Sequence, residues 1–279
     1  MQKIDVLTIQ DISCVGQCSL TVALPIISAC GVEAAILPSA VLSTHTGGFT
    51  GFTFRDLSDD MPSIRDHWIK TGIVFGSIYT GYLGSAKQIE TVLSIADTCL
   101  EDGGKLIVDP AMADNGKLYP GFDLEYVSEM RKLCACADVL LPNLTEAALL
   151  TGMEYRADGY EEGYIRALCE ALCNLGAKTV VLTGVSYSAD KLGVAVYENG
   201  AFSYYFHERL PGGSHGTGDV YASSFVGSLA RGKGIGDAAR IAADYTLECI
   251  RITKSDETHW YGVKFEKAIP KLLAALNKE

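Results

Sequence analysis

The sequence predicts a three-layer α/β/α fold with a mainly parallel central sheet. Short apolar, β-rich runs alternate along the chain with segments of helical period, as expected for strands buried between layers of helices. Hydrophobic residues make up 48% of the 279 residues, enough for a substantial core. No repeat, linker or low-complexity tract interrupts the pattern, so residues 1–279 are predicted to form a single domain.

Six apolar runs are expected to be the buried parallel strands. They are Val6–Ile9, Ala34–Leu37, Ile73–Ile78, Leu106–Val108, Val139–Leu141 and Val180–Leu182. A hairpin is predicted at the sheet edge, over Lys191–Tyr197 and Ala201–Phe206, because Asn199-Gly200 supplies the positive φ angles of a tight turn. Ligands of such a sheet bind beyond the carboxyl ends of the parallel strands.

Apolar residues at helical spacing indicate three helices between and after these strands. The first covers Ser85–Leu100, where Ser85 and Gln88 have the spacing of a capping box. The second covers Glu161–Leu175 and the third Gly218–Arg231, and a glycine suited to the left-handed conformation follows each of them. The third helix is expected to be amphipathic.

Charge and cysteine content narrow the function classes. A net charge of -11 without a lysine or arginine cluster argues against nucleic acid as a partner, and no apolar stretch is long enough for a membrane span. The alternating start of the chain, Met1–Gln10, is predicted to be a strand rather than a signal peptide. The nine cysteines lack the spacing of zinc sites and are expected to be reduced, which favours a cytoplasmic location.

The strongest chemical signal is the glycine-rich segment Gly212–Gly218, which is followed by Asp219 in the first turn of a helix. Glycines let backbone amides approach an anion closely, and at the start of a helix these amides are unpaired. The loop Gly216–Gly218 is therefore predicted to hold phosphate oxygens. The bland alternative is that glycines make loops and that aspartate suits any first helical turn. Taken in isolation, the segment supports both interpretations equally.

Oxygen ligands are predicted to meet at the carboxyl edge of the sheet. Asp109 follows one predicted strand, and Asn143 with Glu146 follows the next. Mg²⁺ usually takes one or two protein carboxylates together with water and substrate phosphates, which suits Asp109 and Glu146. Asn143 and Glu146 also have the spacing of a capping box for a helix over Leu144–Leu150. Both roles can coexist if the cap leaves one carboxylate oxygen free.

Neither a lysine-bearing phosphate loop nor the dinucleotide-binding glycine fingerprint is present. The chain instead resembles the ribokinase-like superfamily and, within it, the vitamin B6 kinases (pyridoxal/pyridoxamine kinases). Five motifs in the family's order, spread over almost the whole chain, carry the resemblance: Ser43–Gly47, Thr80–Ser85, Asp109–Met112, Leu141–Glu146 and Gly216–Asp219. It implies an ATP-dependent kinase that phosphorylates the 5'-hydroxymethyl group of pyridoxal, pyridoxamine or pyridoxine, with Mg²⁺, a nearby monovalent cation such as K⁺, and a homodimeric assembly.

The resemblance also implies roles for individual residues. Asp219 is the implied base that accepts the proton of the hydroxymethyl group, and Gly216, Thr217 and Gly218 are the implied phosphate loop. The remaining implied sites are the vitamer pocket (Asp11, Ser13, Thr46, Tyr82), the nucleotide site (Asp114, Tyr119, Asn143, Thr183, Gly184) and the metal site (Asp109, Glu146). Thr183 and Gly184 match the family's segment near the ATP phosphates, and the bland alternative for them is an ordinary exit from a strand into a loop. The segment Glu208–His215, rich in Gly and Pro, could act as a mobile cover over the site.

One position departs from the family. Where many B6 kinases have Gln-Ser-His after the first strand, this chain has Gln10-Asp11-Ile12-Ser13, which puts Asp11 in place of a substrate-binding serine. A carboxylate there could accept a hydrogen bond from the vitamer ring and favour a cationic amine such as pyridoxamine. A hydroxymethylpyrimidine kinase is the main alternative function. A non-catalytic B6- or nucleotide-binding protein and a sugar kinase are the others, the last disfavoured because Ser43–Gly47 and Tyr82 suit a flat ring.

Overall fold

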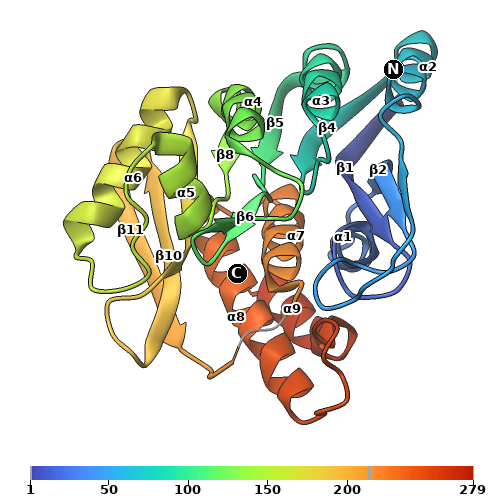
Figure 1. Ribbon diagram of the computed structural model, residues 1–279. Helices are drawn as coiled ribbons and strands as arrows, with labels where there is room; N and C mark the ends of the chain where they lie inside the picture. Colours follow the sequence, from blue (N-terminus) through green and yellow to red (C-terminus); the bar gives the residue numbers. More distant parts are fainter. Residues whose placement is uncertain (1, 213–214, 279) are drawn as a thin grey trace.

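The structure is a computed structural model that describes residues 2–212 and 215–278 (Figure 1). Gly213 and Ser214 of the predicted glycine-rich segment lie outside the described residues. Within the described ranges, nine strands form one sheet. Their order across the sheet is β11 (Ala201–Glu208), β10 (Lys191–Glu198), β9 (Thr179–Val185), β8 (Val139–Leu140), β5 (Leu100–Val108), β4 (Ile73–Thr80), β1 (Gln2–Ser13), β2 (Ala34–Leu42) and β3 (Phe54–Asp56).

The sheet confirms the predicted fold class. The six predicted strands correspond to β1, β2, β4, β5, β8 and β9, and all of their mutual pairings are parallel. The antiparallel pairings are those of β3 with β2, β9 with β10 and β10 with β11. β10 and β11 form the predicted edge hairpin, and its turn residues Asn199 and Gly200 have φ angles of 51° and 79°. Asn and Gly tolerate this left-handed backbone at little cost.

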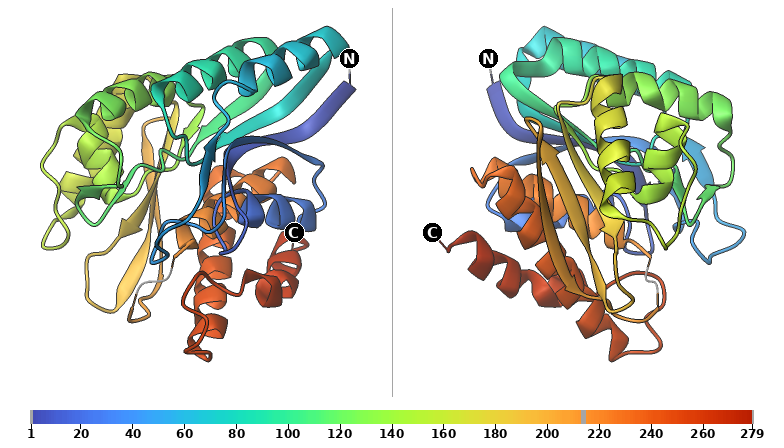
Figure 2. Two further views of the ribbon diagram at one scale, coloured as in Figure 1. Left: turned by 45° about the vertical axis from the view of Figure 1, so that its right-hand side comes forward. Right: turned by 90° about the vertical axis from the view of Figure 1, so that its left-hand side faces the viewer.

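Helices cover both faces of the sheet (Figure 2). One apolar core joins the sheet to α2 (Met61–Thr71), α3 (Ala86–Cys99), α4 (Leu124–Ala135), α5 (Leu144–Thr151) and α6 (Glu162–Leu175). A second core joins the opposite face to α1 (Leu20–Ala29), α7 (Thr217–Ala230), α8 (Ile235–Lys254), η1 (Phe265–Ala268) and α9 (Ile269–Leu276). Neighbouring residues of β1 enter opposite cores, Val6 the second and Leu7 the first, because side chains alternate along a strand.

Two predictions about helix sequence are wrong in detail. Ser85 caps α3 by accepting a hydrogen bond from the Gln88 amide, but the Gln88 side chain does not return to Ser85, so the capping box is incomplete. The helix predicted over Gly218–Arg231 is α7, which begins at Thr217. It is not amphipathic, because every residue from Val220 to Ser228 is buried. α7 lies between the sheet, α1 and α8, so it has no broad solvent-facing side.

The topology creates one place where the direction of winding reverses. The chain passes from β1 to β2 through α1 on one face of the sheet, whereas the helices that connect β4, β5, β8 and β9 pack on the other face. The reversal lies between β1 and its neighbour β4. In open parallel sheets, ligands bind in the crevice beyond the carboxyl ends of the strands at such a point.

Candidate functional site

The sequence-predicted residues gather at the carboxyl edge of the parallel strands. Their positions are Asp11 and Ser13 at the end of β1, Tyr82 after β4, Asp109 after β5, Asn143 and Glu146 after β8, and Thr183 and Gly184 at the end of β9. α7 begins at the same edge and brings Asp219 into its first turn (Figure 1). The edge therefore combines strand-end side chains with the amino terminus of a buried helix.

Asp219 is held by the loop that follows β1. The Ser19 amide donates a hydrogen bond to Asp219 Oδ2 over 3.0 Å. Burial raises the pKa of Asp219 to about 6; the Ser19 amide opposes this rise, and the negative charge of Asp11 adds to it. A carboxyl with such a pKa is mainly ionised at neutral pH and yet basic enough to accept a proton from an alcohol in a reaction.

Glycine occupies positions 216 and 218, before Asp219, for two different physical reasons. Gly216 caps α7 with φ +73°, and a Cβ there would lie 2.0 Å from the carbonyl oxygen of Gln17, so only glycine fits. Gly218 has an ordinary helical φ, and a Cβ built on it meets no atom within 4 Å. The backbone alone does not demand glycine at position 218. Its open space lies at the amino terminus of a helix, where the helix dipole and the backbone amides favour an anion.

Asp109, which is partly buried, and Glu146, which is 2% exposed, form an acidic pair. Burial raises the pKa of Asp109 well above its ordinary value, with further increases from the charges of Glu146 and Asp219. Burial raises the pKa of Glu146 to about 8, although backbone amides that include those of Asn143 and Met112 stabilise its charge. Two carboxylates whose charges interact in a site of low dielectric repel one another unless a proton or a cation compensates their charge.

Glu146 completes a capping box with Asn143, as the sequence predicted. Its Oε2 accepts from the Asn143 amide over 2.9 Å, and its Oε1 accepts from the Met112 amide over 3.2 Å. The cap itself leaves Oε1 free, as expected, but the Met112 amide engages that oxygen. Each carboxylate oxygen still has a second lone pair, so a further ligand is compatible with both bonds.

The donor set suits a hard cation that also takes ligands from water and phosphates. Asp109 and Glu146 supply carboxylates, and Thr80 Oγ1 is buried without a hydrogen-bond partner next to the strand end that Asp109 follows. Within residues 2–212 and 215–278, no group of three or more His, Cys, Asp or Glu side chains could enclose a metal ion. Mg²⁺ does not need such a cage, because it keeps several waters and binds substrate phosphates.

Asp11 is a buried carboxylate beside the proposed base. Its residue is only 5% exposed, and Ser13 Oγ donates to its Oδ2 over 2.9 Å. Burial raises the pKa of Asp11, while hydrogen bonds from Ser19 and Ser13 oppose the increase. Ser13 is 1% exposed, so water does not compete for this bond, and the Ser13 hydroxyl orients the Asp11 carboxylate. Ser19, whose amide donates to Asp219, carries no motif in the sequence and was missed.

Tyr82 lies in a loop that is fixed from several sides. Ser39 Oγ donates to the Tyr82 carbonyl over 3.1 Å, and the Tyr126 hydroxyl donates to the next carbonyl, that of Leu83. The Gly84 amide donates to Gln88 Oε1 over 2.7 Å. The Tyr82 ring is half-buried and lies 5.5 Å from the Phe122 ring. Its flat face is thus held in place at the carboxyl end of β4.

Gln88 organises this loop and was not predicted as a functional residue. It is fully buried, and its Nε2 donates to the Ser39 carbonyl over 3.0 Å and to Ser58 Oγ over 3.0 Å. With the bond from Gly84, the side-chain amide connects the β4 loop to β2 and to the segment after β3. The sequence predicted only a capping role for Gln88, from its spacing to Ser85. Its hydrogen-bond partners in other segments are visible only in the structure.

Thr46 is exposed, and the neighbouring His45 is buried. His45 Nδ1 accepts from the Gly47 amide over 3.0 Å, and its Nε2 lies 2.9 Å from the Tyr261 carbonyl oxygen, a geometry that fits a neutral ring with the proton on Nε2. A Cβ on Gly47 would lie 2.7 Å from the His215 ring. The Thr46 loop therefore packs directly beside the glycine loop.

The residues predicted for nucleotide binding lie in two groups. Asn143 and Thr183 form a parallel bridge between the ends of β8 and β9. The Asn143 side chain is engaged by the amides of Thr145 and Glu146 and by the Ala113 carbonyl. Gly184 lies inside β9 with φ +79°, opposite a register shift in β10, so the bland alternative of an exit into a loop at Thr183 and Gly184 does not hold. A bulge of this kind bends the strand end and exposes backbone groups.

Asp114 and Tyr119 belong to the short ribbon of β6 (Ala113–Asp114) and β7 (Lys117–Leu118) and its exit. Asp114 is exposed, and its Oδ1 accepts from the Asn115 amide over 2.8 Å. Tyr119 is 37% exposed; burial of its hydroxyl and the charges of Glu146 and Asp114 raise its pKa. The ribbon thus brings Tyr119 close to the acidic pair, whereas the Asp114 carboxylate is used within its own turn.

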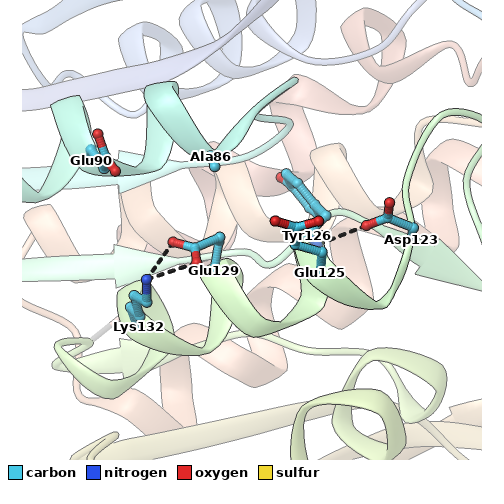
Figure 3. A pocket seen from close by; sticks show the side chains of 7 residues that line it. All are labelled: Ala86, Glu90, Asp123, Glu125, Tyr126, Glu129 and Lys132. Carbon is cyan, nitrogen blue, oxygen red and sulfur yellow. Dashed lines mark hydrogen bonds and ion pairs between the residues drawn. The ribbon is translucent and has the colours of Figure 1, made fainter.

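A pocket of about 350 Å³ lies away from these residues, between α3 and α4 (Figure 3). It is lined by Ala86, Glu90, Asp123, Glu125, Tyr126, Glu129 and Lys132. None of the sequence-predicted site residues lines it. In the described part of the chain, no helix has the length and apolar character that a membrane crossing requires.

A protein-family model matches most of the chain, and curated proteins match about two thirds to four fifths of it. A family model described as phosphomethylpyrimidine kinase matches residues 5–263. A pyridoxal kinase from Arabidopsis thaliana is 29% identical over 193 residues, which are 66% of this chain and 60% of that one. A hydroxymethylpyrimidine/phosphomethylpyrimidine kinase from Rhizobium meliloti is 27% identical over 227 residues, covering 78% of this chain and 79% of that one.

Solved structures share the fold. A Bacteroides thetaiotaomicron protein, provisionally described as a phosphomethylpyrimidine kinase and crystallised with pyridoxal, is 36% identical with a TM-score of 0.91, covering 96% of each chain. Pyridoxal kinase from Lactobacillus plantarum is 34% identical with a TM-score of 0.88, covering 97% of each chain. Pyridoxal kinase from Leishmania donovani, in complex with ADP and pyridoxine, is 21% identical with a TM-score of 0.85, covering 96% of this chain and 95% of that one.

Proposed function

Because this chain belongs to the phosphomethylpyrimidine kinase family, a family of kinases that act on alcohols, we propose that it phosphorylates the 5'-hydroxymethyl group of a B6 vitamer with ATP. The vitamer is pyridoxal, pyridoxamine or pyridoxine. The relatives divide between pyridoxal kinases and hydroxymethylpyrimidine kinases. Both groups are kinases, and they differ in the aromatic ring of the substrate.

The observation that carries the proposal is the meeting of Asp219 with the helix start and with the acidic pair. Asp219 stands in the first turn of α7, directly after the open space at Gly218. Asp109 is close enough to Asp219 for the two charges to affect each other. Phosphoryl transfer depends on holding the phosphates, compensating their charge and removing a proton from the alcohol, and this arrangement supplies a group for each task.

In the proposed reaction the first-turn amides of α7 hold phosphate oxygens of ATP, and the open space at Gly218 admits them. Asp219 accepts the proton of the hydroxymethyl group while the alcohol oxygen attacks the γ-phosphorus, and the bond from that phosphorus to the β,γ-bridging oxygen breaks so that ADP leaves. Asp109 and Glu146 would hold Mg²⁺, which supplies charge compensation at the phosphates when it is bound. The nucleotide-binding roles of five residues stay predictions: Asn143, Thr183, Gly184, Asp114 and Tyr119. A bound K⁺ and a homodimeric assembly also stay predictions.

The vitamer is proposed to bind between Asp11, Tyr82 and Thr46. The fixed Tyr82 ring offers a flat apolar face to an aromatic ring. Asp11 is buried beside the base, so a hydrogen-bonding group of the ring, or a cationic amine on it, would compensate the carboxylate. This favours pyridoxamine among the three vitamers.

Hydroxymethylpyrimidine is the second candidate substrate. A carboxylate such as Asp11 also suits the amino group and ring nitrogen of an aminopyrimidine, and the matching family model carries the pyrimidine kinase description. A binding protein without catalysis is the third candidate. The intact combination of Asp219, glycine loop and acidic pair argues against it, since binding alone does not require a base.

ADP release from ATP and Mg²⁺ should be measured with pyridoxal, pyridoxamine, pyridoxine, hydroxymethylpyrimidine and ribose as separate acceptors. The proposal predicts turnover of at least one B6 vitamer with a kcat/KM above that for hydroxymethylpyrimidine. Turnover of the pyrimidine alone would transfer the assignment to the second candidate. Tight vitamer binding by calorimetry without ADP release from any acceptor would support the binding protein instead.

A further inference from the structure

The loop between β1 and α1, residues 14–19, carries the amide that binds the proposed base. The Ser19 amide donates to Asp219 Oδ2 over 3.0 Å. Two residues earlier, the Gln17 carbonyl oxygen lies against Gly216, where a Cβ would approach it to 2.0 Å. Gly216 is the N-cap of α7, the helix that holds Asp219. The position of this loop therefore affects both the bond to the base and the start of its helix.

The Gln17 side chain ties this loop to the C-terminal part of the chain. Its Nε2 donates to the two carboxylate oxygens of Glu266, over 2.9 and 3.1 Å. Its Oε1 lies 2.7 Å from His259 Nε2. A carboxylate only accepts hydrogen bonds, so the amide nitrogen of Gln17 faces Glu266 and its oxygen accepts from the imidazole. Glutamine supplies a donor and an acceptor together, which is what these two partners require.

The backbone of the same C-terminal region packs on the loop. The Gln17 amide donates to the Tyr261 carbonyl over 3.3 Å. A Cβ on Gly262 would lie 2.5 Å from the Gln17 Cβ, so the two chain segments are in direct contact. The Tyr261 carbonyl oxygen also lies 2.9 Å from His45 Nε2, in the loop that follows β2. One carbonyl of the C-terminal region thus joins the loops that follow β1 and β2.

The internal stability of the loop does not explain these contacts. Thr21 Oγ1 donates to the Cys18 carbonyl over 2.7 Å and to the Gly16 carbonyl over 3.2 Å, and these bonds close the turn before α1. They act between neighbours in the chain. The side-chain partners of Gln17, by contrast, lie 242 and 249 positions further along the sequence. Gln17 therefore fixes where the loop lies relative to the C-terminal region.

We propose that Gln17 is a positioning residue that ties the loop beside the base Asp219 to His259 and Glu266. This inference rests on the proposed function. A base removes the proton efficiently only while its carboxylate is held at the alcohol, so a looser loop lowers the turnover number more than the affinity for the acceptor. The region after α8 thereby contributes to catalysis, although it carries none of the motifs that the sequence analysis identified.

An exchange of the two side chains tests the proposal. Gln17→Glu places a second carboxylate against Glu266, and their repulsion should lower kcat by about 5–20-fold while the KM for the acceptor changes less than about 3-fold. Glu266→Gln alone should keep kcat within about 2-fold of wild type, because its amide oxygen still accepts from Gln17. The double variant Gln17→Glu/Glu266→Gln reverses the hydrogen bond and should restore kcat to within about 2-fold of wild type.

Gln2→Glu is the matched control. It makes the same chemical change at an exposed glutamine at the other end of β1, so it should leave kcat at the wild-type value. A wild-type kcat in Gln17→Glu, a double variant as slow as Gln17→Glu, or the same loss in Gln2→Glu would each overturn the inference while the wild type still turns over. If the wild-type protein releases no ADP with any acceptor, the proposed function fails, and the inference that rests on it fails with it.

Discussion

Asp219 combines two properties that can be measured separately, a raised pKa and a place in the first turn of a helix. An ionised carboxylate in its buried site is costly for the fold, since the pKa is about 6 in the folded protein and close to the ordinary 3.8 after unfolding. This carboxyl therefore destabilises the fold at pH values above its folded pKa. The destabilisation decreases as the pH falls from about 6 towards 3.8.

Asp219→Asn is accordingly expected to raise the free energy of unfolding at pH 8 by about 1–2 kcal/mol, and the gain should disappear near pH 4. Urea unfolding at several pH values measures it. Asp237→Asn is the control, because Asp237 occupies the corresponding first-turn position of α8 and pairs with Arg240 at the surface. A pH-independent difference between wild type and Asp219→Asn would contradict the assigned environment.

The acidic pair predicts a pH-dependent response to magnesium. Glu146 has a pKa of about 8, so Mg²⁺ must displace a proton from it at lower pH. The increase in melting temperature on adding Mg²⁺ with ATP should be larger at pH 8.5 than at pH 6.5. It should be abolished in Glu146→Gln and retained in Glu125→Gln, an exposed glutamate of α4. Equal protection of both variants would rule out Glu146 as a metal ligand.

At the scale of single residues, the sequence predicted the groups that carry formal chemistry but not those that orient them. Asp219, Asp109 and Glu146 were predicted from motifs and from strand ends, and the structure brings them to one edge of the sheet. Ser19 and Gln88 were missed, because their roles depend on contacts between segments far apart in the chain. Neither position has a local pattern that distinguishes it from a loop or helix residue.

Among the elements, α7 and α8 form an internal comparison. Both begin with a residue followed by Gly-Asp, Thr217-Gly218-Asp219 in one helix and Ile235-Gly236-Asp237 in the other. A Cβ on either second-position glycine meets no atom within 4 Å. The two first turns therefore share the Gly-Asp sequence and the open space at the glycine, although their caps differ, Gly216 being left-handed (φ 73°) and Gly234 extended (φ -65°). Only the start of α7 lies at the carboxyl edge of the sheet.

Gly218→Ala is expected to raise the KM for ATP by about 10-fold or more, because the methyl group enters the space proposed for a phosphate oxygen, while stability stays the same or increases by up to about 1 kcal/mol. Gly236→Ala should give the same stability effect with an unchanged KM. Steady-state kinetics with ATP as the varied substrate, together with thermal unfolding, would check both variants. An unchanged KM for ATP in Gly218→Ala would contradict the proposed phosphate position.

The loop after β4 gives a second prediction at this scale. Gln88→Ala removes the side chain that binds the Gly84 amide and the Ser39 carbonyl, and should lower the free energy of unfolding by about 2–4 kcal/mol. It should also raise the KM for the acceptor, because Tyr82 is no longer fixed. Lys87→Ala, which removes only an exposed ion pair with Asp59, should change stability by less than about 1 kcal/mol and leave that KM unchanged. A KM at the wild-type value in Gln88→Ala would show that the loop keeps its shape without Gln88.

Secondary structure was predictable where it depends on local pattern. The six buried strands and the hairpin follow from apolar runs and from the Asn-Gly turn, and the structure confirms them. The capping box at Ser85 and the amphipathic character of α7 were wrong, because tertiary contacts decided both. Gln88 finds better partners than the helix start, and α7 is covered by α1, α8 and the sheet.

Over the whole molecule, the topology determines where the site lies. The winding reverses between β1 and β4, and Asp11, Ser13 and Tyr82 lie at this point. Of the acidic pair, Asp109 directly follows β5, and Glu146 lies in α5 after β8. The fold class was predicted from sequence because an alternation of strands and helices over this length has few stable arrangements. The aromatic ring of the substrate could not be predicted from sequence, because Asp11 suits a pyridine and an aminopyrimidine alike.

The most direct test of the account is the turnover number of Asp219→Asn with ATP, Mg²⁺ and the preferred acceptor, measured beside Asp237→Asn. If Asp219 is the base, its loss should lower kcat by about 10²–10⁴-fold with the fold intact, while Asp237→Asn retains wild-type activity. A kcat for Asp219→Asn within about 3-fold of wild type would contradict the central claim that the carboxyl at the start of α7 removes the proton from the alcohol.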